Sequence, residues 1–115
     1  MLYFHTPLNK RGKNLNWYFK NKKLEELYLN GKCGKYKLEK RIIKKFMMSV
    51  KKIVVAKDIY DLQTPANLFE KLKGYENRYS IRINDKYRLE FEIEWDDKEK
   101  GIVEIIGIEE LIKTL

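Results

Sequence analysis

The spacing of the apolar residues changes once along the chain, and this change constrains the fold more than any other feature. Over residues 38–57 apolar side chains recur every three or four positions, which is typical of a helix with one buried side. Over residues 79–95 they alternate with polar side chains, which is typical of strands with one buried face. The chain is therefore predicted to be α+β.

The shorter segments fit the same plan. A first strand is predicted at 15–19, followed by a helix that Asn21 caps and that ends at Asn30-Gly31. One further helical turn is predicted at 58–64, a tight turn at 84–86, strands at 69–73, 79–83, 87–95 and 102–106, and a short C-terminal helix at 108–115. The expected fold is a small antiparallel or mixed sheet meander packed against an N-terminal helical hairpin.

The length and the composition bound the class of protein. A chain of 115 residues has room for one domain, predicted at 15–115, after a flexible N-terminal extension at 1–14 that shows no period. One cysteine and one histidine exclude a disulfide framework and a Cys-based zinc cluster, so we expect no metal and no cofactor. No stretch approaches the ~20 apolar residues of a membrane span. A cytoplasmic location is expected.

Positive charge is concentrated in the first half of the chain. Residues 1–60 hold sixteen Lys and Arg against four Asp and Glu, whereas residues 61–115 hold nine against thirteen. Such a basic half attracts polyanions, and nucleic acid is the leading candidate. An acidic protein partner, or helix faces that are simply solvated by lysines, explains the same pattern.

The predicted sheet supplies one cluster of cations. Lys71 and Lys73 are two residues apart, so they share a face of one strand. Arg82 and Arg88 lie on the polar faces of two strands joined by a tight turn, which makes them cross-strand neighbours. If the register places all four on one surface beside a tyrosine hydroxyl, a phosphodiester is the natural anion to neutralise them.

The same pattern has a second interpretation. Arg88 alternates along its strand with Glu90, Glu92 and Glu94. Cross-strand Arg–Glu pairs of this kind are common on solvated sheet faces and need no ligand. The spacing alone leaves both interpretations open.

Residues 69–95, FEKLKGYENRYSIRINDKYRLEFEIEW, resemble the signature of the RelE/ParE toxin superfamily, and within it the HigB-like branch of plasmid-maintenance killer proteins. The motifs shared with that branch are K-L-K-G at 71–74, Y-S-I-R-I-N at 79–84 and the Y-R pair at 87–88. The sequences I-V-E-I-I at 102–106 and E-E-L-I-K at 109–113 are similar to the last strand and tail of the family. The resemblance covers about 95 residues, from near residue 15 to the end.

The resemblance implies the toxin of a type II toxin–antitoxin module. Such a toxin is expected to be a ribosome-dependent endoribonuclease that cleaves mRNA in the ribosomal A site by transesterification through the ribose 2′-OH. Its implied partners are mRNA on the ribosome, ribosomal RNA and a cognate HigA-like helix-turn-helix antitoxin. Two alternatives stay open: a ParE-like DNA gyrase inhibitor, and a catalytically weakened homologue that only binds its antitoxin.

The resemblance also implies roles for individual residues. Arg88 would stabilise the pentacovalent phosphorane, and Arg82 and Lys73 would hold phosphates. Lys71 would hold a phosphate or assist proton transfer. The implied RNA-binding residues are Tyr87, which takes the place of a frequent tryptophan and would stack on a base, together with Tyr79 and Arg78.

The acid/base position departs from the family pattern. HigB-like members often carry a histidine near the C-terminus, where this chain has Thr114. Glu109 is the candidate substitute if the tail shifts, and Thr114 occupies the position itself. Because neither is a base poised near neutral pH, the identity of the proton donor and acceptor stays open.

Overall fold

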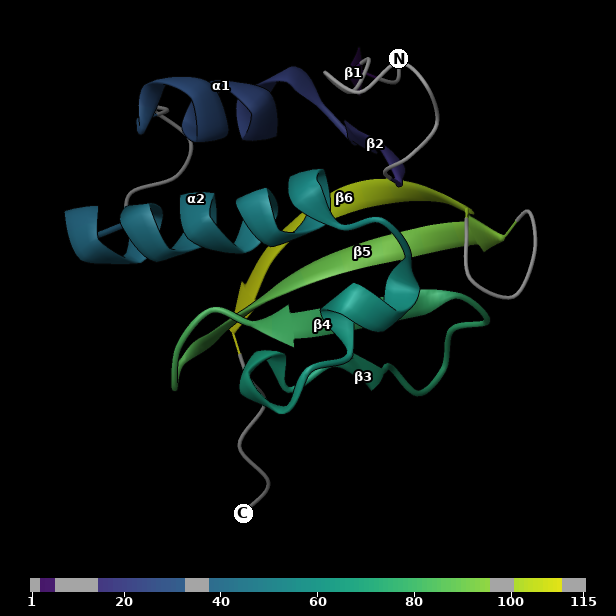
Figure 1. The fold of residues 1–115 in the computed structure, drawn as a ribbon. Helices are drawn as coiled ribbons and strands as arrows, with labels where there is room; N and C mark the ends of the chain where they lie inside the picture. Colours follow the sequence, from purple (N-terminus) through teal and green to yellow (C-terminus); the bar gives the residue numbers. More distant parts are fainter. Residues whose placement is uncertain (1–2, 6–14, 33–37, 96–100, 111–115) are drawn as a thin grey trace.

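The computed structural model describes residues 3–5, 15–32, 38–95 and 101–110 (Figure 1). Its helical elements are α1 (Lys22–Asn30), α2 (Lys40–Val55) and two short 3-10 turns, η1 (Ile59–Leu62) and η2 (Pro65–Asn67). Its strands are β1 (Tyr3–His5), β2 (Asn16–Phe19), β3 (Glu70–Lys71), β4 (Arg78–Arg82), β5 (Tyr87–Trp95) and β6 (Gly101–Glu110). The α+β prediction is confirmed.

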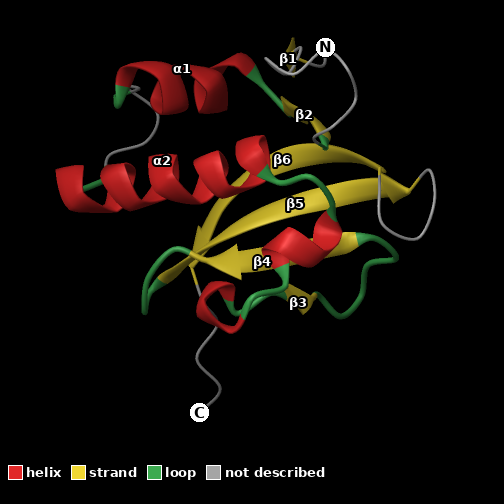
Figure 2. Cartoon of the chain, in the orientation of Figure 1, coloured by secondary structure: helices red, strands yellow, loops and turns green. Residues whose placement is uncertain are grey.

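The described strands form one sheet in the order β1-β2-β6-β5-β4-β3. β2 and β6 are parallel, and every other neighbouring pair is antiparallel, so the sheet is mixed. α1 and α2 pack against the same side of this sheet (Figures 1 and 2). One face of the sheet therefore lies against the helical layer, and the other carries the polar side chains.

The ends of α1 follow from its flanking residues. The Asn21 side-chain oxygen accepts a hydrogen bond of 3.0 Å from the backbone N–H of Leu24, as the capping prediction required. At the other end Gly31 adopts the left-handed conformation, with φ of 72°, and its N–H donates to the carbonyl of Leu27. Both predicted ends of this helix are confirmed.

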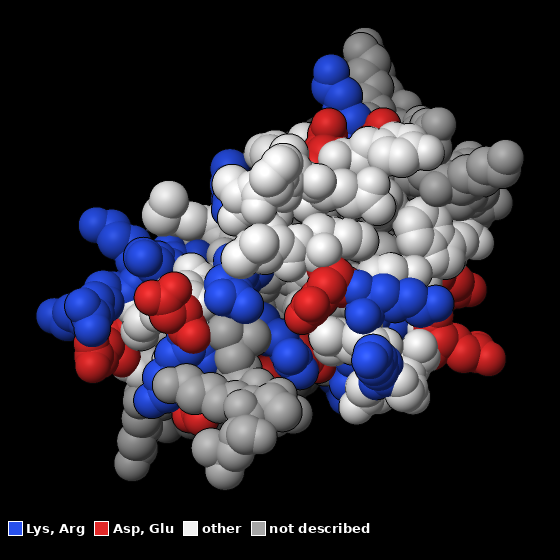
Figure 3. All heavy atoms as spheres, turned by 90° about the horizontal axis from the view of Figure 1, so that it is seen from below, with Lys and Arg blue, Asp and Glu red and all other residues white. Residues whose placement is uncertain are grey.

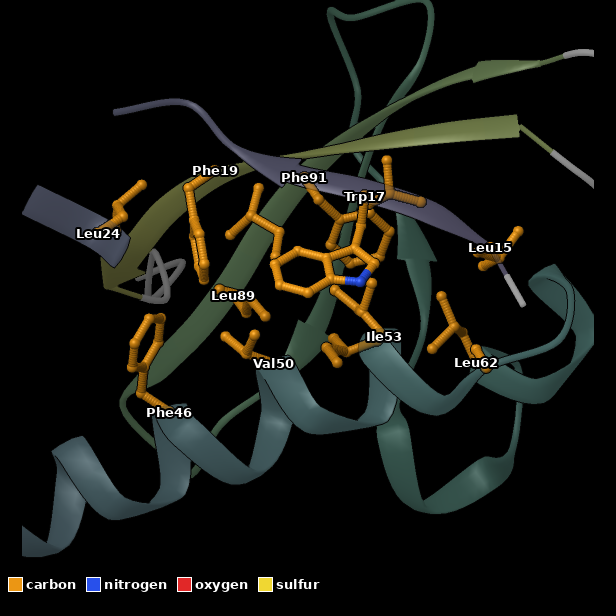
Figure 4. Packing of buried hydrophobic residues seen from close by; sticks show 14 of the residues in the cluster. Leu15, Trp17, Phe19, Leu24, Phe46, Val50, Ile53, Leu62, Leu89 and Phe91 are labelled. Carbon is orange, nitrogen blue, oxygen red and sulfur yellow. The ribbon is translucent and has the colours of Figure 1, made fainter. Parts of the chain in front are cut away.

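The core lies between α2 and the helix-facing side of the sheet. Phe46, Val50 and Ile53 follow the helical period and are fully buried. They pack against the residues that alternate along the strands, among them Trp17 and Phe91 (Figure 4). The stripe of apolar residues in the long predicted helix is thus the main contact of the helical layer.

The predicted C-terminal helix is wrong for residues 108–110, which extend β6 and pair with residues 87–89. A register shift opposite Glu90 and Phe91 is the reason. Because of it, Ile105 and Ile108 are three residues apart and still share the helix-facing side of the sheet, opposite Phe91 and Leu89. In the sequence this spacing of three resembles helical periodicity. Residues 111–115 lie outside the described residues.

Two further segments differ from the prediction. β3 is limited to Glu70–Lys71 rather than 69–73, because the chain turns through Gly74, whose φ is 88°. Within the predicted extension, Tyr3–His5 forms β1 and pairs with β2. The rest of 1–14 lies outside the described residues, and the division of the chain into an extension and a domain stays a prediction.

Candidate active site

The pairing register arranges the polar face of the sheet in rows that cross the strands. Residues directly opposite one another in antiparallel strands project from the same face. One row is Arg82, Arg88 and Glu109, on β4, β5 and β6. The next row holds Ser80, Glu90 and Gly107, and the one after it holds Arg78, Glu92 and Glu104.

The turn between β4 and β5 fixes this register. The side-chain oxygen of Asn84 accepts hydrogen bonds from the backbone N–H groups of Lys86, at 2.9 Å, and Tyr87, at 2.8 Å. A slip of one residue would send Arg88 into the apolar core and Leu89 to the polar face. The predicted cross-strand pairing of Arg82 with Arg88 is confirmed.

Arg82 and Arg88 line a small pocket. Its volume is about 170 Å³, and its other lining residues are Leu68, Phe69, Glu70 and Ser80. Two like charges directly opposite each other destabilise a sheet unless a counter-charge is present. Among the described residues, Arg82 has no ion-pair partner. The pocket is smaller than the roughly 300–1,000 Å³ of sites for drug-sized ligands, and its two guanidinium groups outnumber the Glu70 carboxylate, which favours a small anion.

Glu90 orients Arg88. Arg88 Nε donates a hydrogen bond of 2.8 Å to Glu90 Oε2, and Arg78 Nη1 lies 3.6 Å from the other carboxylate oxygen. The Glu90 side chain is only 7% exposed, so this carboxylate is held between two guanidinium groups beneath the polar surface. Among the described residues, Glu90 is the one hydrogen-bond partner of the Arg88 side chain, so its other N–H groups can donate to a ligand in the pocket.

Replacing Glu90 by Gln tests this orienting role. We expect a loss of about 1–3 kcal/mol in stability, because an ion pair becomes a hydrogen bond from the charged guanidinium to a neutral amide oxygen. We also expect roughly a tenfold lower rate of the reaction proposed below, with substrate binding weakened less, because Arg88 is retained but misdirected. Single-turnover kinetics at varied protein concentration measure the reaction rate and the substrate binding, and urea unfolding measures the stability. An unchanged rate in the folded variant would show that Glu90 has no part in orienting Arg88.

Arg78 occupies the same face two rows from the pocket, and its charge is already paired. Its Nη2 lies 2.7 Å from Glu92 Oε2, and its Cζ lies 4.2 Å above the ring of Tyr75. Figure 3 shows basic and acidic side chains lying next to one another on the side of the molecule where β3 lies. The cross-strand Arg–Glu pairing that the second interpretation predicts is therefore present around Arg78. The pocket lies beyond these pairs, toward Arg82 and Arg88.

The structure places Lys71, Tyr79 and Tyr87 on the opposite face of the sheet from this row. Lys71 lies opposite Tyr79, so both belong to the helix-facing side of the sheet, where Tyr79 stacks on Phe69 at 5.4 Å between ring centroids. Tyr87 precedes Arg88 on β5 and so projects from that side too. Lys73 follows β3 in a turn, and Thr114 lies outside the described residues. Lys71 therefore does not share the polar face with Arg82 and Arg88, and the condition that the register places all four cations on one surface is not met.

Three residues near the pocket were not singled out from the sequence. The sequence pattern allows Glu90 to belong to a solvated sheet face and gives Ser80 no role, yet these two residues are 5% and 2% exposed. Glu70 brings a carboxylate to the pocket lining through its pairing with Ser80. The period of two places all three on the polar face, but burial on that face depends on the neighbouring arginines, which the period does not show.

The row containing Glu104 adds a second electrostatic feature. Burial, and then the charge of Glu92, raises the pKa of Glu104, against the opposing effects of Lys20, a hydrogen bond with Tyr18, and Arg78. Burial and the nearby Glu104 carboxylate also raise the pKa of Tyr18. An ionised Glu104 is therefore less stable in the folded protein than in the unfolded chain.

This shift predicts a pH effect. Just above pH 4.5, the ordinary value for Glu, folded Glu104 still holds the proton that the unfolded chain has released. The stability that protonated Glu104 contributes is therefore fully present below pH 4.5, and it is lost as the pH rises through the pKa of Glu104 in the folded protein. We expect Glu104→Gln to stabilise the protein at pH 7 by less than about 1 kcal/mol, since the group is partly exposed. Urea unfolding at pH 7 and pH 4.5 checks this, and a less stable variant at pH 7 would contradict it.

None of the described helices is long and apolar enough to cross a membrane. Among the same residues, no three His, Cys, Asp or Glu side chains lie close enough together to hold a metal ion.

The fold and the pocket define a small α+β protein in which two directly opposed arginines line a pocket on the polar face of the sheet. A family model described as the RelE-like toxin of the type II toxin–antitoxin system HigB matches residues 17–105. The chain belongs to this family and is a type II toxin, which implies an antitoxin partner. The predicted resemblance is confirmed. No curated protein matches the chain.

Proposed function

We propose that this toxin is an endoribonuclease that cleaves mRNA at the row formed by Arg82, Arg88 and Glu109. The observation that carries the proposal is the pair of directly opposed arginines at the pocket, of which only Arg88 is ion-paired among the described residues. A phosphodiester would supply the ion-pair partner that Arg82 lacks among the described residues. Membership of the HigB family supports the same reaction class.

The proposed reaction is transesterification within the RNA strand. The ribose 2′-oxygen attacks the adjacent phosphorus, a bond from this oxygen to phosphorus forms, and the bond to the 5′-oxygen breaks. The 2′-OH proton passes to a base and a proton reaches the leaving 5′-oxygen, which gives a 2′,3′-cyclic phosphate and a 5′-OH. Arg88 stabilises the charge of the pentacovalent phosphorane, and Arg82 holds a phosphate oxygen.

Two carboxylates flank the arginines and compete for the role of proton acceptor. Glu109 lies beside Arg88 in the same row, on the exposed end of β6. Glu70 lines the pocket from β3. Comparing Glu109→Gln with Glu70→Gln in pH–rate profiles assigns the role, because only removal of the base abolishes the acid limb of the profile.

The proposal places the substrate on the ribosome. A catalytic cluster without a strong base works best on RNA whose 2′-oxygen is already held in line with the phosphorus and the leaving 5′-oxygen. The ribosomal A site would hold the mRNA in this way. The partners are then mRNA, ribosomal RNA and a HigA-like helix-turn-helix antitoxin, in the cytoplasm. The other predicted residues, Lys71, Lys73, Tyr79 and Tyr87, would contact RNA that passes around the β3 edge or the β4–β5 turn.

Primer extension on a defined mRNA in a purified translation system tests the proposal. Cuts that require ribosomes and that appear with the wild-type protein support the ribosome-dependent reaction. Cuts that appear equally without ribosomes would show that the protein is a nuclease but that its activity does not depend on the ribosome. Intact mRNA with a folded protein would overturn the nuclease, and a supercoiling assay would then test the gyrase-inhibitor alternative.

A further inference from the structure

A groove runs along the outer side of the helical hairpin, away from the pocket. Two hollows of about 480 and 470 Å³ adjoin there and share Lys44 and Met47 in their linings. Tyr28 and Leu29 of α1 form one wall, and Met47 and Met48 of α2 form the floor and edge. The groove follows α2 from Lys40 to Lys51, which is roughly 16 Å of helix.

The groove exposes apolar side chains that a free surface seldom shows together. Leu29 is 58% exposed and Met48 is 61% exposed. Methionine side chains adapt to the shape of a partner and are common in surfaces that bind helices. An apolar strip of this kind is typical of a helix-binding groove.

Among the residues that the structure describes, every charged residue lining the groove is basic. Lys40, Arg41, Lys44 and Lys51 line it. α2 contains six Lys and Arg and no Asp or Glu, so no acidic residue of the helix itself balances these charges. Among the described residues, the one ion pair of a basic lining residue is that between Arg41 and Glu39, in which both side chains are exposed. A partner with carboxylates on both sides of an apolar stripe complements this surface.

We propose that the groove binds an acidic amphipathic helix of a protein partner, and that this helix belongs to the antitoxin. Leucine-like side chains at helical spacing would fill the space beside Met47 and Met48. Carboxylates on either side would pair with Lys44 and Lys51. The proposal is independent of the nuclease reaction, because the groove shares no lining residue with the arginine pocket.

RNA is the other class of polyanion that the lysines would attract. The groove favours protein over RNA because its floor is aliphatic and thioether, whereas sites that bind single-stranded RNA present aromatic rings for bases to stack on. Tyr28 is the one aromatic residue of the lining within the described part of the chain, and it is half-buried and packs against Trp17 and Phe19 of the core.

Fluorescence anisotropy with defined probes tests the proposal. The probe is a labelled helical peptide of about 16 residues, with leucines spaced three and four apart and glutamates on both sides. A peptide with lysines in place of the glutamates and a single-stranded RNA of similar length are the comparisons. The protein variants are Met48→Glu, Lys44→Glu and the control Lys45→Glu, an exposed α2 residue outside the groove linings.

We expect saturable binding of the acidic peptide only. Met48→Glu and Lys44→Glu should each weaken it about tenfold, and Lys45→Glu by less than about twofold, with melting temperatures unchanged because all three positions are exposed. No saturation up to about 1 mM would overturn the proposal. Equal weakening by Lys45→Glu would overturn it too, since it would show non-specific attraction. RNA binding that Lys44→Glu removes and Met48→Glu leaves intact would reassign the groove to RNA.

Discussion

Arg88→Ala should lower the single-turnover rate of mRNA cleavage by about 10²–10³, the usual cost of removing a donor that stabilises charge in the transition state. The reason is geometric, because Glu90 directs this guanidinium toward the pocket that it lines with Arg82. Arg88→Lys should recover only part of the rate, since lysine keeps the charge but not the planar fork of donors. Primer extension time courses measure both variants.

Folding must be separated from catalysis in this test. Arg88→Ala also removes one partner of the buried Glu90, so some loss of stability is expected, and melting curves of each variant establish that the protein is folded at the assay temperature. Lys57→Ala is the control, because Lys57 is an exposed cation beyond the end of α2. Cleavage by folded Arg88→Ala at the rate of the control would place the reaction elsewhere.

Phe46→Ala should destabilise the protein by about 3–5 kcal/mol. Phe46 is fully buried on α2, where it packs against the helix-facing side of the sheet (Figure 4). A loss of this size is a large share of the 5–15 kcal/mol that stabilises an ordinary domain. The urea midpoint should fall sharply while the slope of the transition stays the same.

Met48→Ala provides the matched comparison for this prediction. Met48 lies on the same helix two residues away and is 61% exposed, so its removal should change stability by less than about 0.5 kcal/mol. A loss below about 1 kcal/mol for Phe46→Ala, or equal losses for the two variants, would mean that α2 does not pack on the sheet as described.

Local patterns predicted most of the fold. The stripe over 38–57 and the alternation over 79–95 became α2, β4 and β5, because each pattern buries one side of a regular element. The capping of α1 was predictable from Asn21 and Gly31 alone. The end of β6 was not predictable from such patterns. One extra residue in the β5–β6 ladder changes the spacing of the buried residues from two to three, and a spacing of three resembles helical periodicity.

The candidate site was only partly predictable, for a related reason. The pairing of Arg82 with Arg88 follows from a tight turn at 84–86, which fixes the register of both strands. The face to which Lys71 belongs depends on how β3 pairs with β4, and spacing within one strand carries no information on that register. The burial of Glu90 depends on two arginines that flank it in space, of which only Arg88 is near it in the chain.

The chemistry at the arginine row is tested most directly by removing the nucleophile from the substrate. The measurement is primer extension on an mRNA that carries a single 2′-deoxy substitution at a nucleotide where the wild-type protein cuts, in the presence of ribosomes. Transesterification requires the 2′-oxygen of that nucleotide, so the account predicts that this one cut disappears while cuts elsewhere on the same mRNA persist. Cleavage at the deoxy position at an unchanged rate would contradict the proposed reaction.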